Sequence, residues 1–131
     1  MSGPKDDAEK PITYAVRLSE RAKRDIDFVT VYLADTVTER LAVNWRTGLN
    51  KAVGTLSLFP HRNAIIAENS LFSFPVRDLL YRRTTNSKAY RVLYRIKEEG
   101  EDGPQVTLIH VRLAERPPIT AEEAREIEAQ Q

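Results

Sequence analysis

The sequence predicts an α+β fold in which a helical hairpin packs on a mainly antiparallel four-stranded sheet. Two observations lead to it. Apolar and polar residues alternate near the N-terminus and in three stretches after residue 75, which is the period of half-buried strands. Between these stretches, apolar residues recur twice at the spacing of one helix face. The predicted element order is therefore β-α-α-β-β-β, with a short helix added at the C-terminus.

Composition limits the classes of function. The 131 residues are 41% hydrophobic and 30% charged, which is typical of one globular domain. The chain has no cysteine, which excludes disulfides and thiolate catalysis and favours the cytoplasm. Two histidines are too few for a His-rich metal site, and no apolar run reaches membrane-spanning length. We therefore expect no metal, no cofactor and no membrane partner.

The N-terminal third predicts a strand and a helix after a polar leader. Residues 1–11 are expected to form a disordered leader. The alternation in Ile12–Leu18 predicts the first strand. Ser19 is a suitable N-cap for a helix that extends to about Asp35, with its apolar stripe facing the core.

A second helix follows after a short break. Thr36 and Glu39 have the spacing of a capping box. The helical periodicity then continues until Pro60 stops it, and the short connection predicts an antiparallel hairpin. Residues 60–74 mix turn formers with apolar residues, which predicts a loop lying over the core.

Three strands joined by short turns form an antiparallel meander, at Val76–Arg83, Ala89–Ile96 and Val106–Leu113. In the middle strand, one face carries the apolar positions Tyr90, Val92, Tyr94 and Ile96. This face is expected to be covered by the helical hairpin. The opposite face, with Arg91 and Arg95, is expected to stay open as a concave basic surface.

The C-terminal segment predicts a short helix. After Pro117 and Pro118, a capping box at Thr120–Glu123 opens a helix from about Ala121 to Ala129. Its apolar face is thin, so we expect it to fold against a partner. The domain is assigned to residues 12–117 and the helical extension to residues 118–131.

Positive charge concentrates on the meander. Between positions 77 and 97 there is one acid, Asp78, against seven basic residues: Arg77, Arg82, Arg83, Lys88, Arg91, Arg95 and Lys97. Residues 98–131 reverse this balance, with nine acids against three bases. Such a distribution suits an anionic partner.

Three runs in this order resemble the RelE/ParE superfamily of toxins from bacterial type II toxin–antitoxin modules. They are residues 14–22 (YAVRLSERA), residues 89–96 (AYRVLYRI) and residues 106–116 (VTLIHVRLAER). The resemblance covers roughly residues 12–117. Leu113 stands where many members carry a histidine, and no Phe, Tyr or Trp follows Tyr94. These departures and the opening run bring the chain closer to the ParE branch.

The resemblance implies a toxin that binds DNA gyrase and is neutralised by a cognate antitoxin, with a toxin–antitoxin hetero-oligomer as the expected assembly. One alternative is a RelE-like endoribonuclease that cleaves mRNA on the ribosome, so the sequence leaves open whether the chain is an enzyme. Another is a non-toxic scaffold with the toxin fold, in which the acidic segment Glu122–Glu128 folds back on the basic meander.

Each of these functions implies a different set of catalytic or binding residues. The ribonuclease would use Arg91, Arg95, His110 and Arg112, because guanidinium groups stabilise charge on a reacting phosphate. A target or nucleic acid would be bound by Arg82, Arg83, Lys88, Arg91, Arg95, Arg112 and Arg116. The antitoxin would cover Leu71, Phe72 and Phe74.

Structural roles compete with these assignments. Arg91 can pair with an acid such as Asp78, and a single strand histidine such as His110 is more often structural than catalytic. The spacing of Tyr90 and Tyr94 favours the core, as does the position of Trp45 on the apolar stripe of its helix.

Overall fold

The computed structural model describes residues 11–131. The leader predicted for residues 1–11 lies outside this range except for Pro11. The helices and strands are β1 (Ala15–Leu18), α2 (Glu20–Thr36), α3 (Glu39–Gly54), β2 (Arg77–Tyr81), β3 (Tyr90–Lys97), β4 (Gln105–Leu113) and α4 (Ala121–Ala129). Three short 3₁₀ helices lie between α3 and β2: η1 (Thr55–Ser57), η2 (Pro60–Arg62) and η3 (Ala67–Leu71).

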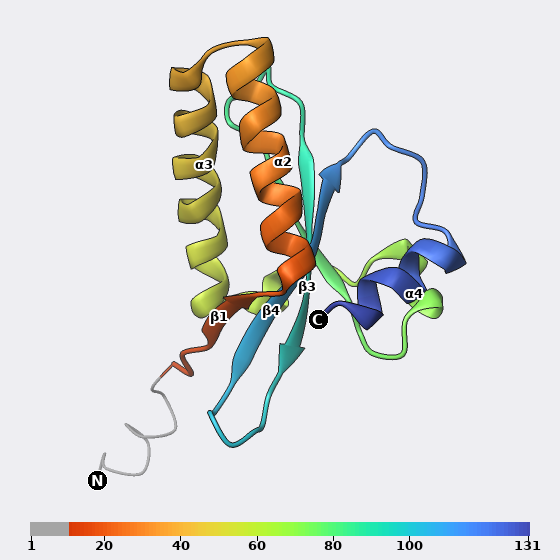
Figure 1. Cartoon of the computed structure of the whole chain (residues 1–131). Helices are drawn as coiled ribbons and strands as arrows, with labels where there is room; N and C mark the ends of the chain where they lie inside the picture. Colours follow the sequence, from red (N-terminus) through yellow and green to blue (C-terminus); the bar gives the residue numbers. More distant parts are fainter. Residues whose placement is uncertain (1–10) are drawn as a thin grey trace, which may run out of the picture.

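The four strands form one sheet in the order β1-β4-β3-β2. β1 pairs in parallel with β4, and the other two pairings are antiparallel, which confirms the predicted topology. The helices α2 and α3 lie side by side on one face of the sheet, and α4 lies on the other (Figure 1). The sheet is thus the middle layer of the molecule.

The hairpin helices begin at polar caps, one of which differs from the prediction. The Ser19 hydroxyl accepts a hydrogen bond from the backbone N–H of Ala22, as expected for an N-cap. Thr36 was predicted to cap α3, and this is wrong. Thr36 ends α2 and its hydroxyl donates to the carbonyl of Tyr32 (2.6 Å), while Thr38 caps α3.

The first strand is shorter than predicted. Pairing with β4 begins at Ala15, opposite Gln105. Ile12 was expected to begin this strand, but it precedes the pairing and is 58% exposed. Tyr14 is the first residue of this region that enters the core.

The main core lies between the helical hairpin and the sheet. Tyr90, Val92 and Tyr94 of β3 point into it, as the alternation predicted. Trp45 of α3 is buried there and packs edge-to-face on Tyr90, with ring centroids 5.1 Å apart. The predictions that these aromatic residues belong to the core are confirmed.

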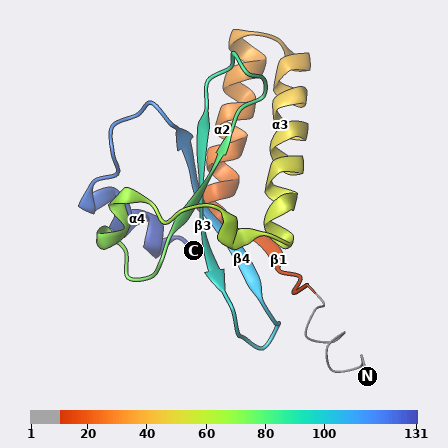
Figure 2. The same cartoon turned by 180° about the vertical axis from the view of Figure 1, so that it is seen from behind.

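The opposite face of the sheet carries a second core and is not the open basic surface that was predicted. Leu93, Ile109 and Val76 are fully buried there under Phe72 and Ile127. Figure 2 shows the segment that precedes β2 crossing this face beside α4. The helix predicted to need a partner therefore buries its apolar side on its own sheet, because Ala124 and Ile127 find apolar neighbours there.

A β-bulge changes which residues of β4 share a face. The register between β3 and β4 shifts at Leu93 and Tyr94. Leu108 packs in the main core, whereas Ile109 packs in the second core. Strict alternation of faces along β4 therefore fails at this bulge.

Candidate functional site

Arg91 is enclosed by carboxylates of its own chain. Its Nε donates to Asp78 (2.8 Å), and its two terminal nitrogens donate to the two oxygens of Glu68 (2.9 and 3.0 Å). The side chains of Arg91 and Glu68 are only 14% and 9% exposed. All three guanidinium nitrogens thus donate to a carboxylate, and the negative charge of the two acids opposes the approach of a phosphate to Arg91.

The hydrogen bonds between Arg91 and Glu68 favour the charged form of both side chains. The hydrogen bonds from Arg91 lower the pKa of Glu68 from 4.5 to about 2. The same bonds raise the pKa of Arg91. Both partners therefore stay charged across the physiological pH range, and the pairing with Asp78 anticipated from the sequence is present.

Arg112 is also buried and paired. Its two terminal nitrogens donate to Glu123 of α4 (3.1 Å) and to the carbonyl of Pro117 (2.8 Å). Burial lowers the pKa of Arg112. Burial opposes ionisation of Glu123, but the backbone N–H of Thr120 and the charge of Arg112 outweigh it, so the pKa of Glu123 is lowered. This pair joins β4 to the C-terminal helix.

His110 is held in a closed cluster between β4 and α2. It is buried, and its Nδ1 lies 2.9 Å from an Asp25 carboxylate oxygen and 3.1 Å from Nε of Arg21. The same Asp25 oxygen accepts the backbone N–H of Val111 (2.9 Å). The Nε2 atom of His110 is enclosed and has no hydrogen-bond partner among residues 11–131. In this position the ring connects α2 to the edge of β4, and the residue is only 2% exposed.

Arg95 lies apart from the other arginines of the proposed catalytic set. Its guanidinium stacks on the ring of Phe74 at 3.9 Å. It lines a small pocket with Arg17, Lys97 and Thr107, which Arg91 and Arg112 do not line. The four residues assigned to a ribonuclease are therefore not gathered in one open cleft.

The β2–β3 hairpin carries accessible basic residues. Arg82 donates to the carbonyl of Ser87 (2.9 Å), and Lys88 pairs with Glu115 (2.8 Å) at the surface. That pairing raises the pKa of Lys88. Arg83 has no ion pair among residues 11–131. In the predicted binding set, Arg82, Lys88 and Arg116 are exposed, while Arg83 and Arg95 are half-buried.

The residues expected to contact an antitoxin pack mainly on their own chain. Phe72 is buried in the second core, and Phe74 lies against Phe72 and under Arg95. The next residue after Phe72, Ser73, donates through its hydroxyl to Glu128 of α4 (3.0 Å). Leu71 is the most accessible of the three predicted residues, at 38% exposed. In this structure α4 occupies the place proposed for a partner.

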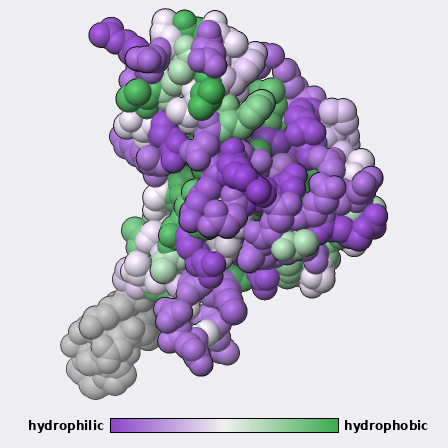
Figure 3. All heavy atoms as spheres, in the orientation of Figure 1, coloured by the Kyte–Doolittle hydropathy of each residue, from purple (hydrophilic) through white to green (hydrophobic). Residues whose placement is uncertain are grey.

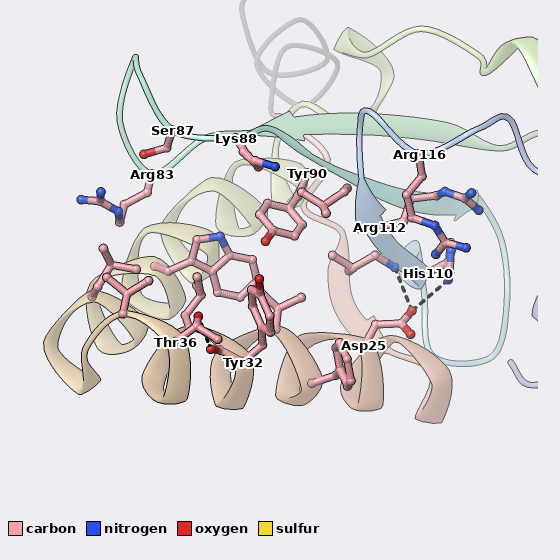
Figure 4. A pocket seen from close by; sticks show the side chains of 18 of the residues that line it. Asp25, Tyr32, Thr36, Arg83, Ser87, Lys88, Tyr90, His110, Arg112 and Arg116 are labelled. Atoms are coloured by element: carbon pink, nitrogen blue, oxygen red, sulfur yellow. Dashed lines mark hydrogen bonds and ion pairs between the residues drawn. The ribbon is translucent and has the colours of Figure 1, made fainter.

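A groove of about 760 Å³ lies between α2, the upper part of the sheet and the β2–β3 hairpin. Figure 4 shows Tyr32 of α2 and Tyr90 of β3 on opposite sides of it. Lys88, Arg83 and Ser87 mark one end, and His110, Arg112 and Arg116 mark the other. This groove combines aromatic walls with a basic rim.

Sequence reasoning missed the α2 wall of this groove. The periodic stripe assigned Ala22, Ile26, Val29 and Leu33 to the buried side of the helix, which is the side facing the core. Phe28, Tyr32 and Val37 lie off this stripe and are 72%, 55% and 55% exposed. Large apolar residues on the expected solvent side of an amphipathic helix were the signal that could have found the groove.

Two classes of site are not found in the described part of the chain. No group of three or more His, Cys, Asp or Glu residues could hold a metal ion within residues 11–131. None of the helices formed by these residues has the length and apolar character needed to cross a membrane.

Comparison with known proteins identifies the fold. No family model and no curated protein matches the chain. Among solved structures, the chain is similar to one described as "Chromosomal ParDE TA system from P. aeruginosa", with a TM-score of 0.58 and 13% sequence identity. The match covers 79% of this chain and 98% of the other. The fold implied by the RelE/ParE resemblance is confirmed.

Proposed function

We propose that this chain is the toxin of a type II toxin–antitoxin module, that it arrests growth by binding DNA gyrase, and that a cognate antitoxin neutralises it. Two independent comparisons support a toxin of this kind. The sequence runs resemble the ParE branch, and the fold is similar to that of a chain from a ParDE TA system. The choice of DNA gyrase as the target is inferred from the sequence resemblance alone.

The observation that carries the choice of a binding protein over a ribonuclease is the state of Arg91. Its three nitrogens already donate to Glu68 and Asp78. Electrostatic catalysis needs donors directed at charge that develops during the reaction, whereas these three N–H groups of Arg91 point at internal carboxylates. The enclosed position of His110 supports the same choice, since a general base must reach its proton.

In this proposal the target contacts the surface cations. Arg82, Arg83 and Lys88 project from one hairpin, where they can meet acidic side chains of a protein target. Arg116 is exposed nearby on the rim of the groove. Such rim charges favour fast and specific association.

A non-toxic scaffold remains the second candidate, because one observation favours it. The acidic helix α4 folds back on the sheet, where Glu123 pairs with Arg112 (3.1 Å) and lies 3.6 Å from Arg116. A chain that neutralises its own basic face could have lost its target.

Induced expression of the full chain in a bacterium tests these functions. Growth arrest with filamentation and gyrase-dependent DNA damage, while translation continues, is the expected result. Immediate loss of protein synthesis with mRNA cleaved in the ribosomal A site would contradict the proposal and favour the ribonuclease. Normal growth would favour the scaffold.

A further inference from the structure

Another hollow, of about 300 Å³, lies on the sheet face that carries α4 and shares no lining residue with the groove. Figure 3 shows a hydrophilic surface over α4 and over the turn that joins β3 to β4. The hollow lies between these two parts, because Lys97 ends β3, Gln131 follows α4, and both line it. We call it the basic pocket, and its lining residues are Arg17, Arg95, Lys97, Gln105, Thr107 and Gln131.

The sheet register places an arginine on each side of one hydroxyl. Thr107 on β4 lies opposite Arg17 on β1 and opposite Arg95 on β3. Residues opposite each other on neighbouring strands share a face and are about 5 Å apart, so both guanidinium groups can reach a ligand held above Thr107. Two residues along the strands, Gln105 lies opposite Lys97. The floor of the pocket is therefore a hydroxyl and an amide with cations beside them.

The basic pocket holds positive charge without a counter-charge. Three cations line it, and no Asp or Glu side chain does. Arg17, Arg95 and Lys97 form no ion pair with any residue in the range 11–131. The next acid along the chain, Glu98, accepts a hydrogen bond from Tyr14 of the main core (2.9 Å). Because like charges held together repel, an anion in the pocket would be attracted by all three cations and would reduce their mutual repulsion.

Arg95 is held in place and still has unused donors. Its guanidinium stacks on the Phe74 ring at 3.9 Å, which orients the plane of the group. One terminal nitrogen donates to the side-chain oxygen of Gln131 (3.4 Å), and the Nε atom is enclosed without a hydrogen-bond partner among residues 11–131. Arg91, by contrast, directs all three nitrogens at carboxylates. An arginine that is already oriented loses little conformational entropy when it binds an oxyanion.

We propose that the basic pocket binds a terminal phosphate group, either free or carried by a small molecule such as a nucleotide. The guanidinium groups of Arg17 and Arg95 would lie on either side of the phosphate, with the Thr107 hydroxyl beneath it. A guanidinium donates two parallel N–H groups to phosphate oxygens, and a hydroxyl donates one O–H group. Lys97 adds a third positive charge. This site goes beyond the proposed toxin function and does not depend on it.

The donors of the pocket favour a terminal phosphate over two other anions. A carboxylate is planar and carries one charge, so a single arginine fork satisfies it. A phosphate monoester carries a charge of about −1.5 to −2 at pH 7 and three acceptor oxygens, which matches a pocket with several cations. A nucleic-acid strand carries one charge per phosphodiester and needs cations along its path. On β3 the next arginine of this face, Arg91, is instead paired with Glu68 and Asp78.

Isothermal titration calorimetry of the full chain tests the site with inorganic phosphate, adenosine 5′-monophosphate and adenosine as probes. The buffer contains about 0.15 M chloride, which screens weak attraction at the surface. We expect saturable binding of both phosphates at one site and no binding of adenosine. Tighter binding of the monophosphate than of phosphate would support a ligand with an organic body, whereas equal affinities would support free phosphate. Equal binding of adenosine and its monophosphate would overturn the proposal.

Two variants place the binding in the basic pocket. Thr107→Val removes the hydroxyl but keeps the branched shape and the net charge, and it should weaken phosphate binding about tenfold, as expected for a lost hydrogen bond to a charged group. Arg17 is exposed on β1, so Arg17→Gln should leave the fold intact and weaken binding about tenfold or more. Arg40→Gln is the matched control, because it removes the same charge from an exposed residue that lines neither the groove nor the pocket.

Four results would contradict the site. The first is the absence of saturable phosphate binding. The second is equal weakening by Arg17→Gln and Arg40→Gln, which would show attraction by net charge. The third is wild-type affinity in Thr107→Val. The fourth is tight binding of a DNA oligonucleotide that Arg17→Gln weakens and a 5′-phosphate does not improve, which would assign the pocket to a nucleic-acid backbone. Growth arrest without phosphate binding would leave the proposed function standing and remove only this ligand.

Discussion

At the scale of single residues, Glu68 connects three separate parts of the chain. It lies in η3, its two oxygens bind Arg91 on β3, and one of them also accepts the backbone N–H of Ile119 (3.1 Å) just before α4. The carboxylate therefore fixes an irregular segment to the sheet and positions the start of the C-terminal helix.

Removal of this carboxylate should be costly. Glu68→Ala leaves the buried charge of Arg91 with one acidic partner among residues 11–131, Asp78, and we expect a loss of about 3 kcal/mol in the free energy of unfolding. Urea unfolding measures it. Glu115→Ala removes an exposed ion pair and should leave stability nearly unchanged. Equal effects of the two substitutions would show that the Glu68 pair is not buried in solution.

The lowered pKa of the Glu68 carboxylate predicts that the stability of the chain depends on pH. Its pKa is about 2 in the folded chain and 4.5 without these contacts. The carboxylate thus contributes its full stabilisation above about pH 4.5, and this is lost as the pH falls toward 2. As the pH falls through this window, the difference in the free energy of unfolding between the wild type and Glu68→Gln should shrink. A constant difference would contradict the lowered pKa.

The sequence anticipated only part of this network. The pairing of Arg91 with Asp78 could be inferred, because neighbouring strands bring nearby residues together. The pairing of Arg91 with Glu68 could not be inferred, because Glu68 lies in a segment without helical or strand periodicity. The cluster of Asp25 and His110 was also missed, because it depends on the angle at which α2 crosses β4 and on a β-bulge.

At the scale of elements, the helical hairpin meets the sheet through a close contact at Gly48. A Cβ at this position would overlap the Tyr81 hydroxyl and lie 3.2 Å from its ring carbon Cζ. The hydroxyl donates to the carbonyl of Trp45 (2.8 Å), which holds the ring in place. Gly48 therefore permits α3 to approach β2.

Gly48→Ala tests this contact. Helix propensity alone would stabilise the chain by about 1 kcal/mol, but overpacking should outweigh it and give a net loss of about 1–2 kcal/mol. In a Tyr81→Phe background the penalty should shrink, because the overlapping oxygen is gone. A thermodynamic cycle from urea unfolding gives the coupling, and additive effects would exclude the contact.

The C-terminal helix is predicted to be part of the folded core. Ile127 is fully buried against the sheet, so Ile127→Ala should cost about 2–5 kcal/mol in the free energy of unfolding. Arg125, on the exposed side of the same helix, provides the control, and Arg125→Ala should change stability by less than about 0.5 kcal/mol. If both variants unfold like the wild type, α4 does not dock in solution.

Periodic elements were the predictable part of the fold. The helical hairpin, the meander and the capped C-terminal helix follow from local spacing and caps. The covering of the second sheet face could not be predicted from local spacing. The helix α4 contributes two fully buried residues, Ala124 and Ile127, and Phe72 reaches this face from a segment without periodic spacing. Tertiary contacts, which local pattern does not encode, decided that the basic face is closed.

At the scale of the whole molecule, both faces of the sheet are covered, and two of the arginines of the predicted site, Arg91 and Arg112, serve the fold. Arg91 and Arg112 join strands to the covering segments, which leaves the hairpin cations and the groove among the accessible interaction surfaces. An apolar groove with a basic rim is suited to protein binding. This arrangement agrees with a function based on binding to macromolecules.

The central claim is that the full chain inhibits DNA gyrase by binding it. The most direct measurement is the supercoiling of relaxed plasmid by purified bacterial gyrase as increasing amounts of the chain are added. We predict that supercoiling falls and that gyrase-linked DNA breaks accumulate, with charge reversal at Arg82, Arg83 and Lys88 weakening the effect. Undiminished supercoiling, with cleavage of ribosome-bound mRNA by the same preparation, would contradict it.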